Sequence, residues 1–530
     1  MRAAPAARGQ GGSHVSVDAW RKPAADGPPG HRGELAGDPE EGAAFLRTAE
    51  SRRLDRSLVQ GMVWTGSIKW ASQVLTWITT IAVARLLRPE DYGLVAMATT
   101  FTSLVAVINE FGVGITVMSL RHLDDDRLAQ LNTFAVGMGV LGLALSCVAA
   151  VPLAHFYQAP ELAVLLSVMG IGFVISSARS VPEALLQKEV RWKLIACVEG
   201  GRLVVQAVST VTLAYLDFGY WALALGSLIG AAVWTALIVL IRPQRFAWPD
   251  PRALREAMAF SGYVVVSRLS WYAQSASDSM IIGRVLGPAA LGAYGMAFSL
   301  AMVPVEKVAA VVSQVTTSLF AAVQDHAAAA RRYMLALTEG FALLGFPTTL
   351  GMALVADEFV MLVLGPKWAS VVDPLRILAF YAAFRSVQSL PAQVLFVTGG
   401  ARLAMMNSLA TAGVLPLAFY LGTHWGIAGV AAAWLVVHPL ASIPINWRVF
   451  NLLGMSLREY LKALWPAFTG ALVMIVGVLA LKSALPTGWS PAAHLGGVVT
   501  GAAVLYGVFI VTFHRVRVAA FVRIIRRRAL

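Results

Sequence analysis

Two polar stripes of similar composition occur in this chain, about 200 residues apart. The first consists of Lys69, Gln73, Thr76 and Thr80, and the second of Arg268, Tyr272, Ser275 and Ser279. Steps of four, three and four residues place each set on one face of a helix. These side chains offer binding chemistry: a cation for an anionic group, and hydroxyl and amide groups for hydrogen bonds. We interpret the stripes as two walls of one polar cavity, with Lys69 and Arg268 facing each other.

The sequence around the second stripe repeats the first at a constant offset of 199 residues. The segment ARLLRPEDYGLVAMA (84–98) aligns with GRVLGPAALGAYGMA (283–297). The matched pairs are Arg85/Arg284, Leu87/Leu286, Pro89/Pro288, Gly93/Gly292 and Met97/Met296. Such internal repeats are typical of membrane transporters, which bind their cargo where the repeats meet. The alternative for the two stripe cations is that each extends along its helix toward a lipid headgroup.

The composition is that of a membrane protein with many helical spans. The chain has 530 residues, of which 58% are hydrophobic and 13% charged, whereas soluble domains carry roughly 25% charged residues. About 14 apolar stretches reach the ~20 residues that a membrane-spanning helix needs, the first near 61–84 and the last near 492–513. We therefore predict an all-α polytopic membrane protein.

The basic residues predict the orientation of these spans. Thirty of the 42 Lys and Arg residues fall on the side that contains both termini, and five fall on the other side. Those five are Arg85, Arg88, Arg284, Lys367 and Lys482. Because basic residues concentrate in cytoplasmic segments, both termini should be cytoplasmic. The net charge of +13 is spread over the connections rather than gathered in a patch, so a nucleic-acid partner is not expected.

The chain divides into four predicted parts. Residues 1–56 are rich in Gly, Pro, Ala and charged residues and predict a disordered cytoplasmic tail. Residues 57–245 and 246–455 predict two lobes of six helices each, related by a parallel repeat because six is an even number of spans. Residues 456–530 predict two extra helices and a basic cytoplasmic tail, whose alternating arginines suit anionic membrane lipid. Gly226 and Gly230 form a GxxxG motif, typical of close helix packing.

Further ionisable residues lie within the predicted spans, where each needs a partner or an aqueous cavity. Glu199 and Arg202 lie one helical turn apart and should neutralise each other, with a part in the transport cycle as the alternative. Glu110 and Asp278 are mid-span carboxylates, candidate proton acceptors or ion-pair partners of the stripe cations. Arg385 suits a phosphate, or equally a buried acid. We therefore take Glu110, Glu199, Arg202 and Asp278 as candidates for ion coupling.

Motifs for catalysis, nucleotide binding and metal binding are not found. The sequence contains no P-loop, no GxSxG and no HExxH, and its two cysteines, Cys147 and Cys197, are too few for a metal site. We expect no catalytic residue, no bound metal and no cofactor. Coupling to H⁺, to Na⁺ or to the membrane potential is left open.

The repeated motif resembles that of oligosaccharide flippases in the multidrug/oligosaccharidyl-lipid/polysaccharide (MOP) superfamily. The resemblance rests on ARLLRPEDYGLVAMA with EFGVG (110–114), on DSMIIGRVLGPAALGAYGMA (278–297) and on LGPKW (364–368). It is greatest to the Wzx-like exporters of lipopolysaccharide and exopolysaccharide, and it covers roughly residues 57–455. It implies a two-lobed bundle in the bacterial inner membrane that alternates between inward- and outward-facing states.

The resemblance also implies the cargo, a short oligosaccharide linked through pyrophosphate to undecaprenol. The cargo would move from the cytoplasmic to the periplasmic leaflet, with a polysaccharide polymerase and a chain-length regulator as candidate partners. The stripe residues and Arg385 suit this cargo, because cations lower the cost of moving a pyrophosphate through hydrocarbon. Gln73, Thr76, Tyr272 and Ser275 suit sugar hydroxyls.

Two other functions are considered. A cation-coupled multidrug exporter of the same superfamily would need more acidic than basic residues in its cavity, whereas the spans contain seven basic and four acidic residues. A membrane enzyme of surface-polysaccharide assembly would need a larger outward loop than the roughly 20 residues predicted here. We therefore favour the flippase, and not an enzyme.

Overall fold

The computed structural model describes residues 70–109, 124–248, 276–322, 326–398, 400–484 and 488–515, with the single residues 68, 117 and 272. All of them belong to one compact unit, Val63–Leu530. Every regular element within these ranges is a helix, which confirms the predicted all-α class. The tail predicted for residues 1–56 lies outside the described residues.

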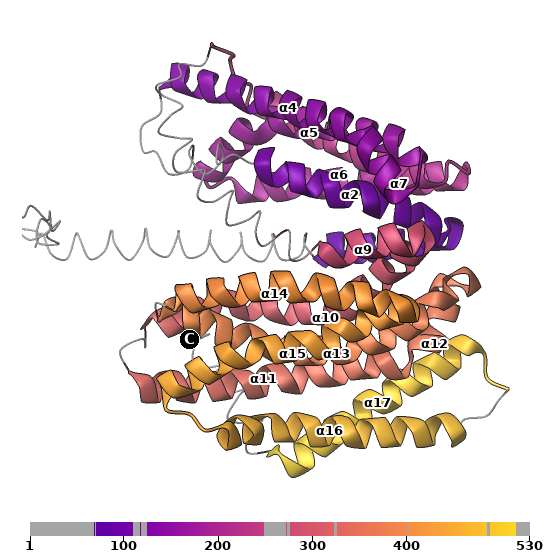
Figure 1. Ribbon diagram of the computed structural model, residues 1–530, viewed down its shortest axis with the longest axis vertical. Helices are drawn as coiled ribbons and strands as arrows, with labels where there is room; N and C mark the ends of the chain where they lie inside the picture. The colour runs from indigo at the N-terminus through magenta and orange to yellow at the C-terminus, as the bar shows by residue number, and fades with distance from the viewer. Residues whose placement is uncertain are drawn as a thin grey trace, which may run out of the picture. The chain divides into compact units, whose positions relative to one another are not determined.

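The described residues of the predicted N-terminal lobe are mostly helical (Figure 1). Residues 70–86 form the described part of the first predicted span. The next elements are α2 (Pro89–Asn109), α4 (Asp125–Tyr157), α5 (Glu161–Lys188), α6 (Trp192–Tyr215) and α7 (Tyr220–Ile241). Helix α4 packs along α5 and α6 along α7, as expected when a short link makes consecutive helices antiparallel neighbours.

The C-terminal half, residues 246–455, is arranged around α13. Its elements are α9 (Ser277–Val285), α10 (Gly287–Ala322), α11 (Ala327–Leu354), α12 (Ala356–Phe359), η2 (Val360–Leu364), η3 (Pro366–Val371), α13 (Val372–Val397), α14 (Ala401–Gly422), η4 (Thr423–Trp425) and α15 (Gly426–Leu453). Helix α13 contacts α10, α11 and α15, so its side chains face three neighbours. Among the α13 side chains that are completely buried are Leu375, Leu378, Tyr381 and Ala382.

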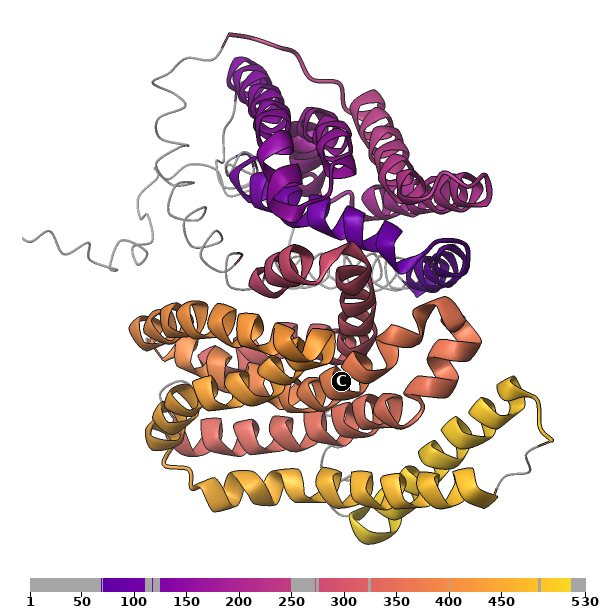
Figure 2. The same ribbon diagram turned by 45° about the vertical axis from the view of Figure 1, so that its right-hand side comes forward.

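Two further helices follow, α16 (Leu457–Ala484) and α17 (Pro491–Phe513). Helix α16 packs against α11, and α17 packs against α16 (Figures 1 and 2). Lys482 near the end of α16 donates to the Glu358 carboxylate at 2.6 Å and to the Leu354 carbonyl at 2.6 Å. Partial burial opposes ionisation of Glu358, but the hydrogen bond and charge of Lys482 hold the pKa of that carboxyl below its usual range.

Nine helical stretches of the described residues are long and apolar enough to cross a membrane. One of them, Arg402–Leu453, contains both α14 and α15. The multi-span class is thus confirmed, while the number of 14 spans and the relation of the lobes remain predictions.

The GxxxG motif packs α7 against α6, as predicted from the sequence. A Cβ atom on Gly226 would overlap the side chain of Thr210, and one on Gly230 would lie 2.8 Å from Cβ of Gln206. The two backbones therefore approach more closely than any larger residue would allow.

Replacing Gly226 by valine should force α6 and α7 apart. Overpacking of a tight contact costs about 1–3 kcal/mol, so the variant should unfold at a lower temperature in detergent and express less well. Gly137→Val on α4 is the matched control, since a Cβ there meets nothing within 4 Å. Equal thermal stability of the two variants would show that this contact is not tight.

Candidate functional site

The two stripe cations lie outside the described residues. The same holds for Ser275 and Glu110, so the facing arrangement of Lys69 and Arg268 stays a prediction. Of the first stripe, Gln73 is half-buried and engaged with a neighbour, while Thr76 is exposed and donates to the Ser72 carbonyl of its own helix at 2.8 Å. The Thr76 hydroxyl oxygen keeps lone pairs with which it can accept a further hydrogen bond.

Tyr272 of the second stripe makes a contact between the two halves. Its hydroxyl donates to the Thr100 carbonyl of α2 and also interacts with Ser103. The hydroxyl of Tyr272 is thus bonded to groups in the opposite half of the molecule. Separation of the two halves would break this hydrogen bond.

Asp278 is a buried carboxylate surrounded by hydrogen-bond donors. It is 4% exposed, and its Oδ2 accepts from the Tyr294 hydroxyl at 2.8 Å and from Trp434 Nε1 at 3.2 Å. Its Oδ1 accepts from the Ser279 backbone N–H at 2.6 Å and from the Ser279 hydroxyl at 3.3 Å. Tyr294 and Trp434 are also bonded to each other at 2.9 Å. Among the described residues, the hydrogen-bond partners of this carboxylate are therefore neutral groups.

An aromatic cluster links Asp278 to Arg385. The ring of Tyr381 stacks on that of Trp434 with centroids 5.3 Å apart, and the Tyr381 hydroxyl accepts from Arg385 Nη1 at 3.1 Å. His438 lies beside both rings, 5.5 Å from Tyr381 and 5.9 Å from Trp434. The tertiary structure thus connects two predicted residues, Asp278 and Arg385, through Trp434 and Tyr381. The links are two hydrogen bonds at the ends and a ring stack in the middle. Within the part of the chain that the structure describes, the recorded side-chain hydrogen bond of Arg385 is to a tyrosine hydroxyl, and the acid that was the alternative is not seen there.

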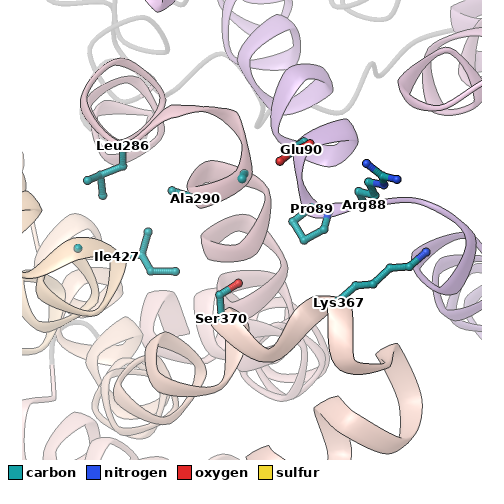
Figure 3. A pocket seen from close by; sticks show the side chains of 10 residues that line it. Arg88, Pro89, Glu90, Leu286, Ala290, Lys367, Ser370 and Ile427 are labelled. Carbon is teal, nitrogen blue, oxygen red and sulfur yellow. The ribbon is translucent and has the colours of Figure 1, made fainter.

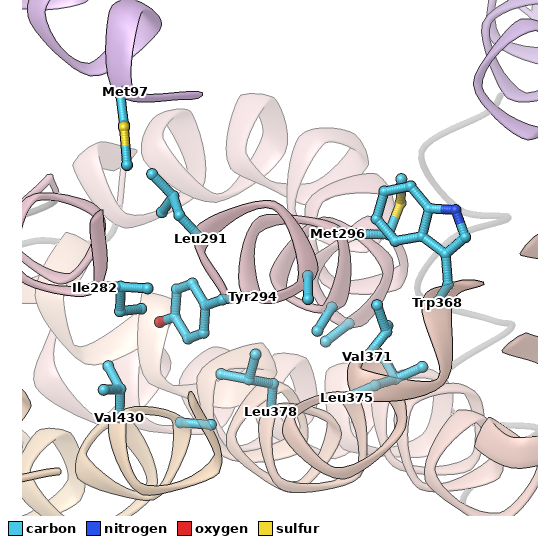
Figure 4. Close-up of a cluster of buried hydrophobic side chains, with 14 of the residues drawn as sticks. Met97, Ile282, Leu291, Tyr294, Met296, Trp368, Val371, Leu375, Leu378 and Val430 are labelled. Carbon is cyan, nitrogen blue, oxygen red and sulfur yellow. The ribbon is translucent and has the colours of Figure 1, made fainter. Parts of the chain in front are cut away.

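Sequence reasoning missed Tyr294, Trp434 and Tyr381. One signal could have found the first of them: Tyr294 occupies the position of Val95 in the repeat, so the second copy has a hydroxyl where the first has a methyl group. Figure 4 shows Tyr294 pointing into the buried cluster, between Ile282 and Leu378. For Trp434 and Tyr381 the sequence carried no such signal.

The candidates Glu199 and Arg202 belong to a second cluster in the N-terminal half. Arg202 donates to Gln206 at 3.0 Å, as expected from their shared helix face. The negative charge of Glu199 interacts electrostatically with the Arg202 guanidinium. The guanidinium carbons of Arg179 and Arg202 lie 3.7 Å and 4.8 Å from the ring centroid of Trp234. These cation–π contacts hold α5, α6 and α7 together.

Arg179 also has an acidic partner on its own helix. Helix α5 continues to Lys188, so Arg179 forms an ion pair at 3.1 Å with Glu183 one turn on. Arg376, at the start of α13, likewise pairs with Asp357. The excess of basic over acidic residues in the spans is therefore smaller than the sequence suggested.

A pocket of about 700 Å³ lies between the two halves at the end where α2 and α10 begin (Figure 3). Arg88, Pro89 and Glu90 line it from the N-terminal half, and Leu286, Lys367 and Ile427 are among the residues that line it from the C-terminal half. The described stripe residues, Gln73, Thr76, Thr80, Tyr272 and Ser279, are not among the residues that line it.

The fold and the buried polar groups define a class: an α-helical membrane protein with ionisable residues inside its bundle. The chain belongs to the polysaccharide biosynthesis protein family, whose profile matches residues 82–373.

Similar proteins come from the same functional context. The lipopolysaccharide biosynthesis protein WzxC of Escherichia coli K12 is 24% identical over 81% of this chain and 88% of its own length. The succinoglycan biosynthesis transport protein ExoT of Rhizobium meliloti 1021 is 26% identical over 75% of this chain and 81% of its own. The lipid II flippase MurJ in an inward closed conformation has the same fold, with a TM-score of 0.68, 12% identity and coverage of 86% and 99%.

Proposed function

We propose that this protein is a flippase for oligosaccharides linked through pyrophosphate to undecaprenol. It moves them from the cytoplasmic to the periplasmic leaflet of the inner membrane by alternating access, for assembly of lipopolysaccharide or exopolysaccharide. Both termini are cytoplasmic, and a polymerase and a chain-length regulator receive the product. The protein binds and moves its cargo and makes or breaks no covalent bond.

The observation that carries this proposal is membership of the polysaccharide biosynthesis protein family. The names of WzxC and ExoT, one a biosynthesis protein and the other a transport protein, support a step that moves a polysaccharide precursor. The fold shared with a lipid II flippase is suited to a lipid-linked cargo. The cations of the two stripes, Lys69 and Arg268, and the exposed guanidinium of Arg385 would bind the pyrophosphate and balance its negative charge.

We infer further that the coupling ion is a proton and that Asp278 carries it. A buried charge is costly unless it is paired, and the partners of Asp278 among the described residues are neutral. Two of those partners, the Trp434 ring N–H and the Ser279 backbone N–H, have no lone pair with which to bind a metal ion. Within the described residues, no three His, Cys, Asp or Glu side chains converge on one point. These features favour a carboxyl group that gains and loses a proton over a sodium site.

Deletion of the gene tests the function. We expect loss of the surface or secreted polysaccharide together with accumulation of sugar-loaded polyprenyl pyrophosphate on the cytoplasmic leaflet, measured by lipid extraction and mass spectrometry. Complementation with the wild-type gene is the control. Normal polysaccharide with altered tolerance of cationic drugs would instead support the multidrug exporter.

A further inference from the structure

The repeated motif forms a contact between its own two copies. Helix α2 begins at Pro89 and α10 begins at Gly287, followed by Pro288, and the two helices pack together. A Cβ atom on Gly93 would overlap the Pro288 carbonyl, and one on Gly292 would overlap the Pro89 carbonyl. Because Pro89/Pro288 and Gly93/Gly292 are equivalent pairs in the repeat, the same contact is made twice in opposite senses. A local two-fold axis between α2 and α10 gives this reciprocity.

The paired arginines of the motif follow the same rule. Arg85 donates from Nε to the Val363 carbonyl at 2.9 Å and from Nη2 to the Leu362 carbonyl, both in the connection that follows α11 and α12. Its equivalent, Arg284, lies 5.7 Å from the centroid of the Phe156 ring at the end of α4. Each arginine therefore reaches from the end of the first predicted span in its own half to the region at the end of the third predicted span in the other.

The LGPKW segment adds contacts that only one half can make. Trp368 is completely buried, and its Nε1 donates to the Ala84 carbonyl at 2.8 Å, while Lys367 Nζ lies 3.5 Å from the Leu86 carbonyl. These carbonyls belong to the last turn of the helix over 70–86, where no helical partner remains. The ring of Tyr92 meets Trp368 edge-on at 5.1 Å.

All of these contacts lie at one end of the bundle, the end that the basic residues assign to the periplasm. Only five Lys and Arg residues are predicted on this side, and three of them, Arg85, Arg284 and Lys367, cross between the halves. Since basic residues are disfavoured in outward segments, a specific contact gives a reason for their presence. Arg85 and Lys367 contact backbone carbonyls, which water can also satisfy, so these two contacts can be exchanged for water at moderate cost.

We propose that the two copies of the motif, together with Trp368 and Lys367, form a clasp that holds the periplasmic end closed and opens when cargo leaves. This inference rests on the proposed alternating-access function. It assigns to the repeated motif a role in closure between the halves, distinct from the cargo binding assigned to the polar stripes. The pocket between Arg88 and Leu286 lies in the same seam and would divide when the clasp opens.

The test measures how often the seam opens, without any cargo. A single cysteine replaces the completely buried Ala84 in a background with Cys147→Ala and Cys197→Ala. Spheroplasts that carry the full-length protein are treated with a membrane-impermeant maleimide, and the labelling rate is followed by a gel shift. We expect Arg85→Ala and Trp368→Phe each to raise the rate about tenfold, the change that losing such a hydrogen bond makes in an equilibrium.

Arg88→Ala is the matched control, because Arg88 is an exposed arginine only three residues from Arg85. Its backbone N–H donates to the Asp91 carboxylate, and this hydrogen bond does not depend on the side chain. Its labelling rate should equal that of the parent. Unchanged labelling in Arg85→Ala overturns the clasp, as does an equal rise in Arg88→Ala. If Trp368→Phe fails to fold, Arg85→Ala decides alone, since the Arg85 side chain is on the surface. The labelling experiment measures opening of the seam and needs no lipid-linked sugar. Its outcome therefore does not depend on whether the deletion experiment supports the flippase proposal.

Discussion

Replacing Asp278 by asparagine is expected to abolish the response of transport to a proton gradient. Asparagine keeps an oxygen that can accept from Tyr294 and Trp434 but cannot take up a proton reversibly. A coupling free energy of ~1–3 kcal/mol corresponds to about a 5- to 150-fold change. We therefore expect the imposed gradient to stimulate flipping by a factor in that range in the wild type and to have no effect in the variant. The measurement is flipping of a fluorescent sugar linked to polyprenyl pyrophosphate in proteoliposomes, with and without an imposed pH gradient.

The carboxylate of Asp373 provides the control for Asp278. Its side chain is 78% exposed at the start of α13 and lies 3.8 Å from Arg376, so Asp373→Asn should leave the gradient response intact. Groups that face Asp278 from neighbouring elements are Tyr294, Trp434, Tyr381 and Tyr272. A sodium gradient that drives flipping in the Asp278→Asn variant as well as in the wild type would refute the assignment.

Removal of either stripe cation should have a comparably large effect. We expect Lys69→Ala or Arg268→Ala to slow flipping by up to about 100-fold, because a charge in the bilayer centre costs ~2.5–3.5 kcal/mol and the pyrophosphate would lose its counter-charge. Lys69→Arg should keep much of the activity, and Lys69→Glu should abolish it. Protein amount in the membrane should stay nearly constant, since a cation in a water-filled cavity contributes little stability.

The matched control for the stripe is Arg402→Ala, which removes an exposed cation at the start of α14. Its flipping rate should stay close to that of the wild type. A structural ion pair would behave differently, because alanine would then lower protein amount and activity together. Full activity of the Lys69→Ala, Arg268→Ala double variant at normal expression would show that the stripes are not the cargo site.

Several local features of the fold could be predicted because they depend on residues near one another in sequence. The helices follow from long apolar stretches, and the tight contact at Gly226 and Gly230 follows from a four-residue spacing of glycines. The contact of Arg179 with Trp234 could not be predicted in this way, because Trp234 lies on another helix, α7.

The candidate site was only partly predictable, and the reason is the distance along the chain between its members. Asp278 could be singled out, because a carboxylate within an apolar stretch is costly wherever it lies. Its partners Tyr294 and Trp434 are 16 and 156 residues away, and Tyr381, which stacks on Trp434, is 103 residues away. None of the three is unusual in a membrane helix. Only the packing of α9, α10, α13 and α15 decides that these rings surround the acid.

The sequence by itself determined that the chain is an α-helical membrane protein with a repeated motif, because hydropathy and a fixed offset can be read without coordinates. It could not say what the repeat is for. The tertiary structure decided that Gly93 meets Pro288 while Gly292 meets Pro89, and that Arg85 reaches the connection before LGPKW. Such contacts join residues about 200 to 280 positions apart, and their partners are mostly backbone carbonyls, which every residue has. No side-chain pattern can therefore announce them, and they exist only once the helices have packed.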